Sequence, residues 1–125
     1  MTYLFIALFA VVGAFARYGQ SAAVQALFGR GFPAATLSIN VFGSFLMGLL
    51  FFATVERFEI SPALRTGILT GGLGAYTTFS TFSLETLNLI EAGEWGKAVL
   101  YVGASVVLSI GAALLGAFVS RNLGV

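Results

Sequence analysis

Four long stretches of the chain carry no charged side chain and are rich in apolar residues. These stretches are residues 1–16, 31–55, 66–84 and 98–120. A helix needs about 20 mostly apolar residues to cross the hydrocarbon of a bilayer. Three of the stretches are long enough as they stand, and the first is long enough if its helix continues past Arg17. The pattern therefore predicts four transmembrane helices, at about residues 3–27, 33–55, 63–90 and 98–119.

The overall composition supports a membrane protein. Apolar residues make up 58% of the 125 positions and charged residues only 9%, whereas soluble domains average about 25% charged residues. The connections between the predicted helices are short, so we expect residues 1–125 to form a single all-α membrane domain. Histidine and cysteine are absent, which removes the commonest proton shuttle, thiolate metal sites and disulfides.

The basic residues near the ends of these helices barely distinguish the two sides of a membrane. With four crossings, they are Arg57, Arg65 and Arg121 on one side, and Arg30, Lys97 and, if its side chain reaches that way, Arg17 on the other. The positive-inside rule needs an excess of Lys and Arg on one side to fix orientation. A small protein can simply have few charges. We favour the other interpretation, in which the chain inserts both ways and forms an antiparallel dual-topology homodimer.

The third predicted helix contains a run of residues that is unusual at the depth of lipid. Residues 71–83 read GGLGAYTTFSTFS. In hydrocarbon each unpaired backbone amide costs several kcal/mol, so irregular backbone there must be buried by protein or lie beside a pore. Gly67 and Gly71 have the spacing of close helix packing. Residues 72–76 are expected to unwind or kink, which would break this helix in mid-membrane and free carbonyls that can coordinate a hard cation.

Two phenylalanines follow the predicted break. Phe79 and Phe82 are three residues apart and therefore share a face of the half-helix that continues the segment. Such a pair is usually a core or lipid contact, but here hydroxyl side chains surround it. Aromatic rings have a positive edge, so two ring edges facing a cavity would attract an anion and exclude bulk water.

The second predicted helix carries one amide among small residues. Asn40 and Ser44 lie on one face, and Ser44 with Gly48 has the spacing of a close-packing pair. Close packing accounts for the serine and the glycine but not for Asn40, because a buried amide needs hydrogen-bond partners. Asn40 is therefore either a hydrogen-bonding link between helices or a pore ligand, and we favour the ligand.

The fourth predicted helix carries a stripe of hydroxyl groups. Tyr101, Ser105 and Ser109 recur every four residues, which gives a stripe about 12 Å long. We favour pore lining over the alternative that the serines bond to carbonyls of their own helix. Ala112 and Gly116 have the spacing of plain helix packing.

Two charged residues lie within or near the predicted crossings. Arg17 is either an anchor that reaches the membrane surface or a positive charge at a pore mouth. Glu85 either faces a vestibule or caps a polar network. The candidate lining as a whole offers hydroxyls, one amide and ring edges, without the ring of carboxylates or carbonyls usual in cation pores. These residues predict a pathway for a small polar solute or an anion.

Four motifs, taken together, resemble the Fluc/CrcB family of fluoride channels. They are GAFAR at residues 13–17, TLSIN at 36–40, GGLGAYTTFSTFS at 71–83 and YxxxSxxxS at 101–109. The resemblance implies a passive fluoride-selective channel, not an enzyme, that exports cytoplasmic fluoride and so lowers its toxicity. It also implies a multi-pass protein of the cell (inner) membrane, an antiparallel homodimer in contact with lipid, and no nucleic-acid partner.

The resemblance further implies roles for individual residues. Phe79 and Phe82 resemble the rings that guide fluoride by their edges, and Asn40 resembles the asparagine that donates to the ion. The implied polar track consists of Ser80, Thr81, Ser83, Tyr101, Ser105 and Ser109. Arg17 resembles the vestibule arginine. The backbone carbonyls of Gly74 and Thr77 resemble those that hold a structural Na⁺ at the dimer interface, while Ala75-Tyr76 departs from the Gly-Leu of other members.

Two other functions are open at this stage. A non-transporting assembly subunit would explain the small-residue seams but not two aligned polar stripes. The main alternative is a small dual-topology exporter of cationic drugs coupled to protons. Such a mechanism needs a carboxylate near the middle of a transmembrane helix. Glu85 is the only candidate, and it lies toward the end of its predicted helix.

Overall fold

All regular elements of the chain are helices within residues 1–122, which are the residues that this computed structural model describes. In chain order they are α1 (Thr2–Phe28), α2 (Ala34–Glu56), α3 (Pro62–Thr66), the π-helix η1 (Gly67–Leu73), α4 (Gly74–Tyr76), α5 (Ser80–Glu91) and α6 (Trp95–Asn122). Three of them, α1, α2 and α6, are long and apolar enough to cross a membrane. The predicted all-α class is confirmed, and these three helices occupy the predicted positions to within a few residues.

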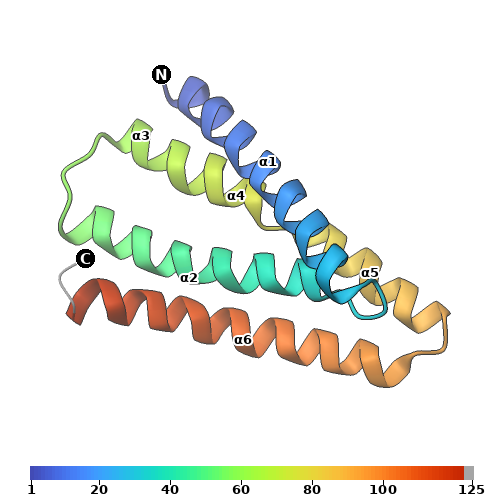
Figure 1. The fold of residues 1–125 in the computed structure, drawn as a ribbon. Coiled ribbons are helices and arrows are strands. Elements are labelled where there is room, and N and C mark those ends of the chain that lie inside the picture. Colours follow the sequence, from blue (N-terminus) through green and yellow to red (C-terminus); the bar gives the residue numbers. More distant parts are fainter. Residues whose placement is uncertain (123–125) are drawn as a thin grey trace.

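The helices run back and forth along one direction (Figure 1). The helices α2 and α6 lie side by side and run in the same direction, and α1 lies against η1 and α4. The N-terminus, residues 57–61 and the end of α6 lie at one end of the molecule, and the other two connections lie at the opposite end. Gly29 and Gly93 open those two connections with φ of 75° and 78°, a conformation that glycine adopts without a steric penalty.

Glycines bring α2 and α6 into direct backbone contact. A Cβ atom on Gly48 would lie 2.1 Å from the carbonyl oxygen of Ala113, and one on Gly116 would lie 2.2 Å from the carbonyl oxygen of Phe45. Neither position has room for any side chain. The packing predicted for Gly48 and Gly116 is confirmed, and each glycine sits against the backbone of the opposite helix.

A second glycine contact joins η1 to α1. A Cβ on Gly67 would lie 2.6 Å from the Cβ of Phe5, and one on Gly71 would lie 2.5 Å from the carbonyl oxygen of Ile6. The close packing predicted for this pair is therefore confirmed. Gly13 of α1 belongs to the same contact, because a Cβ on Gly13 would collide with the carbonyl oxygen of Gly72.

The position expected for the break in this segment is wrong. Residues 72–76 were expected to unwind, but η1 runs to Leu73 and α4 runs from Gly74 to Tyr76. The glycines seat this stretch against Phe5 and Ile6 of α1, and the backbone there stays helical, as a π-helix up to Leu73. The chain leaves the helix at Thr77, which is extended with φ −86° and ψ 162°, and α5 begins only at Ser80.

A cluster of buried apolar side chains lies next to the interruption between α4 and α5. Ile39 of α2, Leu69 and Leu73 of η1 and Tyr76 of α4 form one buried cluster. Most large apolar side chains of α1 and α6 instead point away from the rest of the chain. An outward-facing apolar surface suits helices surrounded by lipid or by another apolar partner.

Candidate functional site

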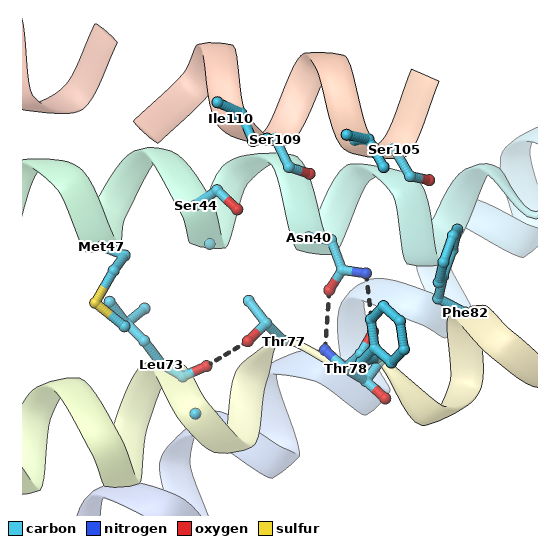
Figure 2. A pocket seen from close by; sticks show the side chains of 14 residues that line it. Asn40, Ser44, Met47, Leu73, Thr77, Thr78, Phe82, Ser105, Ser109 and Ile110 are labelled. Carbon is cyan, nitrogen blue, oxygen red and sulfur yellow. Dashed lines mark hydrogen bonds between the residues drawn. The ribbon is translucent and has the colours of Figure 1, made fainter. Parts of the chain in front are cut away.

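The amide of Asn40 bridges the interruption between α4 and α5. Its Nδ2 donates to the Thr78 carbonyl at 2.9 Å, and its Oδ1 accepts from the Thr78 backbone N–H at 2.9 Å (Figure 2). One side chain thus satisfies both backbone groups of Thr78, which a continuous helix would have paired. The role of Asn40 as a link between helices is confirmed, while its contact with an ion stays a prediction.

The side chain of Thr78 caps the start of α5. Its hydroxyl accepts from the Thr81 backbone N–H at 3.2 Å and donates to the Thr81 hydroxyl at 3.2 Å. A threonine hydroxyl that accepts from an N–H three residues later is a typical helix N-cap arrangement. Sequence reasoning passed over Thr78, although a threonine just before a helix is a recognisable start signal.

A glycine of α2 makes room for the extended residue of the break. Thr77 donates its hydroxyl to the Leu73 carbonyl at 2.9 Å, which fixes the side chain. Its methyl group then lies only 2.2 Å from the place where a Cβ on Gly43 would be. Gly43 was also missed from the sequence, where a single glycine inside a helical pattern was its only signal.

Arg17 binds the end of α4 rather than standing free. Its Nε donates to the carbonyl of Ala75 at 3.2 Å. The last carbonyls of a helix lack partners and carry partial negative charge, so a cation there is favourable. This contact fits neither of the two roles considered for Arg17. The place of Arg17 at a pore vestibule stays a prediction.

A groove with a volume of about 510 Å³ opens beside the break, between α2, α6 and the α4–α5 segment (Figure 2). The predicted site residues that line it are Asn40, Gly74, Thr77, Phe79, Phe82, Ser105 and Ser109. Ser44 and Thr78 add two more hydroxyls, and the remaining side chains of the wall are apolar. Residues far apart in the sequence therefore meet at one surface, as the sequence predicted.

The hydroxyl of Ser105 is the polar group that this groove leaves unsatisfied. The residue is 7% exposed, and its Oγ has no hydrogen-bond partner within residues 1–122. A buried polar group without a partner costs about 1–3 kcal/mol. Bonding to its own helix, the alternative considered for these serines, is therefore wrong for Ser105. This hydroxyl is available to a ligand in the groove.

Three aromatic rings lie in a row of tilted contacts at one end of the groove. The ring centroids of Phe79 and Phe82 are 5.5 Å apart, and those of Phe82 and Tyr101 are 5.1 Å apart. Phe79 is 77% exposed, whereas Tyr101 is fully buried and donates its hydroxyl to Glu85 Oε1 at 2.8 Å. Glu85 thus caps a polar network, one of its two predicted roles. Tyr101 lies behind the rings and outside the groove lining.

The other hydroxyls of the predicted track lie on α5 outside the groove lining. Ser80 Oγ is 3.4 Å from the Thr78 hydroxyl, and Thr81 takes part in the cap of α5. Ser83 donates to the Phe79 carbonyl at 3.0 Å. Contact of these three hydroxyls with an ion stays a prediction.

The predicted cation ligands are two backbone carbonyls at the groove. In a continuous helix the Thr78 N–H would bond to the Gly74 carbonyl, but here it donates to Asn40. The carbonyls of Gly74 and Thr77 are therefore both at the irregular end of α4. No three Asp or Glu side chains lie together within residues 1–122. These oxygen atoms fit a hard cation, which prefers oxygen ligands.

Comparisons with known proteins match nearly the whole chain. Residues 4–117 match the family described as "CrcB-like protein, Camphor Resistance (CrcB)". A protein of Acidithiobacillus ferrooxidans named "Fluoride-specific ion channel FluC" is 68% identical over 121 residues, which is 97% of each chain. Proteins of the same name from Magnetococcus marinus and Geobacter sulfurreducens are 52% identical over 97% of this chain and 98% of theirs, and 47% identical over 98% of both.

The helices and the comparisons agree on the kind of protein. Three apolar helices of 27, 23 and 28 residues make the chain a multi-pass membrane protein. The family match extends from α1 into the last turns of α6 and includes the groove. This chain belongs to the CrcB-like protein family.

Proposed function

We propose that this chain is a passive fluoride-selective channel that exports cytoplasmic fluoride, as the names of its relatives suggest. The observation that carries the proposal is the buried, unpartnered Ser105 hydroxyl in a groove otherwise lined by donors and apolar groups. Fluoride is a small anion that accepts short hydrogen bonds, so it suits such a lining. The groove lining contains no carboxylate.

Other groups at the groove favour a negative ion. The Asn40 amide nitrogen carries two hydrogens, and one of them is used on the Thr78 carbonyl, so the second is free to donate. The N-terminus of α5 lies at the break and carries partial positive charge. The Phe79 and Phe82 rings lie beside these donors, where positive ring edges add to the attraction.

The working assembly in this proposal is an antiparallel dual-topology homodimer in the inner membrane. The interrupted stretch from α3 to α5 is the third of four crossings and is broken in mid-membrane. The whole chain is one domain. Two features of the single chain support a partner copy: Phe79 is mostly exposed, and Gly74 is exposed beside the groove. A second copy would cover both. The Gly74 and Thr77 carbonyls of the two copies would hold a Na⁺ ion at the interface.

The proton-coupled drug exporter receives no support. It needs a carboxylate facing an open cavity near the middle of a crossing. Glu85 lines a cavity at the end of the molecule where α1 joins α2, not near the middle of a crossing, and it accepts a hydrogen bond from the buried Tyr101 hydroxyl. A fixed acceptor of this kind suits a structural network better than a site that exchanges protons with a transported cation.

Purified protein in liposomes tests the function. Liposomes loaded with potassium fluoride should release fluoride rapidly when a potassium ionophore balances the charge, and liposomes loaded with chloride should not. Release without the ionophore, or release that needs a proton gradient, would favour an exchanger. Equal rates for fluoride and chloride would contradict the proposed selectivity.

A further inference from the structure

We propose that Tyr76 and Gln20 form a positioning pair that holds the end of α4 and thereby places Thr77 at the groove. This inference deepens the proposed function, and its conductance test rests on that function. Tyr76 is the residue just before the break. Asn40 holds Thr78, two positions later.

A chain of hydrogen bonds runs from α4 through α1 to α2. The Tyr76 hydroxyl donates to Gln20 Oε1, and Gln20 Nε2 donates to the Ser38 hydroxyl at 3.2 Å. Ser38 in turn donates to the Ala35 carbonyl at 2.7 Å. Each side chain has a partner, so one polar connection links three elements that are distant in sequence.

The tyrosine ring is itself held in place. Tyr76 is only 6% exposed, and the Phe42 ring packs edge-on against it with centroids 6.5 Å apart. Both Tyr76 and Gln20 border a mainly apolar cleft between α1, α2 and η1. In such surroundings a hydroxyl and an amide without partners would be unfavourable, so the bond between them is retained.

The break is consequently held from two helices. Arg17 and Gln20 are three residues apart on α1 and share a face, from which they bond the Ala75 carbonyl and the Tyr76 hydroxyl. On the other side of the break, Asn40 of α2 holds both backbone groups of Thr78. Thr77 is the one residue between these two anchors. Its carbonyl direction therefore depends on both.

The test removes the polar link and keeps the packing. In Tyr76→Phe and in Gln20→Leu, the unitary fluoride current in planar bilayers should fall at least about threefold, the factor that follows from losing one neutral hydrogen bond. The double variant should fall no further than Gln20→Leu, because Gln20→Leu already loses the bond to Tyr76 together with the bond to Ser38. Tyr18→Phe, a change at an exposed tyrosine of α1, should leave the current unchanged.

Unitary current separates positioning from folding, since misfolded protein lowers the number of channels and not the current through each. Wild-type unitary currents in Tyr76→Phe would overturn the inference. A second readout needs no conduction: hydrogen exchange of the backbone amides at residues 77–79 should be faster in Tyr76→Phe by about threefold or more. Unchanged exchange would also overturn it, whereas a wild-type protein that passes no fluoride would overturn the proposed function alone.

Discussion

The Asn40 side chain does for Thr78 what the next turn of a helix would have done. A carboxamide carries a donor and an acceptor side by side, as a peptide group does. It can therefore pair with one N–H and one C=O of a residue that has left the helix. An aspartate is almost the same size but cannot donate when ionised.

Asn40→Asp should abolish fluoride release from liposomes. The Thr78 carbonyl loses its donor and the groove gains a negative charge, together about 3 kcal/mol or roughly a factor of 100 in rate. Asn122→Asp is the matched control, because Asn122 donates to a carbonyl of its own helix at an exposed position. Normal release by Asn40→Asp would refute the role given to this amide.

Gly43→Ala should reduce fluoride release because the new methyl group collides with the Thr77 methyl group. Forcing an extra methyl into a packed site costs about 1–3 kcal/mol. Thr77→Ser removes the colliding methyl and keeps the hydroxyl that bonds to Leu73. The double variant should therefore recover most of the lost rate. If Thr77→Ser gives no recovery, the contact is not the cause.

At the scale of the helices, long charge-free runs were enough to locate α1, α2 and α6. Burial in lipid selects apolar residues all round a helix, so length and composition suffice. The glycine-rich segment could not be read in the same way. Gly71 and its neighbour allow both an unwound backbone and a close helix contact, and only the presence of Ile6 of α1 decides between them.

Gly116→Ala should destabilise the protein, since the new Cβ would lie 2.2 Å from the Phe45 carbonyl oxygen. An overpacking cost of about 1–3 kcal/mol corresponds to a fall of roughly 5 °C or more in the thermal unfolding midpoint in detergent. Gly96→Ala lies in the same helix with no neighbouring atom within 4 Å. It should leave the midpoint unchanged or slightly raised. Equal midpoints for both variants would contradict the backbone contact.

At the scale of the whole molecule, helical spacing predicted which residues share a face but not which face meets the groove. Ser105 and Ser109 line the groove, whereas Tyr101, four residues earlier on the same stripe, turns behind the aromatic rings to Glu85. That difference depends on the angle between α5 and α6. No property of the α6 sequence alone specifies that angle.

The basic side chains at one end of the molecule are largely engaged with the chain itself. Arg57 donates to the carbonyls of Ser120 and Arg121 at 2.9 and 2.8 Å. Arg121 in turn pairs with Glu56 at 3.3 Å. These contacts join the end of α2 to the end of α6.

Because the chain has no cysteine, a single introduced thiol reports its orientation. Gly31→Cys lies in an exposed connection where a Cβ meets no atom within 4 Å. A membrane-impermeant thiol reagent applied to intact cells whose outer membrane has been permeabilised should label about half of the protein, as dual topology requires. Labelling of all or none of it would establish one orientation and contradict the antiparallel dimer.

The backbone contact between α2 and α6 also fixes the spacing of the polar side chains in the groove. Asn40 and Ser44 belong to one of these helices and Ser105 and Ser109 to the other, and the seam at Gly48 and Gly116 has no slack in which they could spread. Close-packed interiors resist such expansion. The spacing of these four side chains across α2 and α6 is therefore set by backbone packing and requires no moving gate.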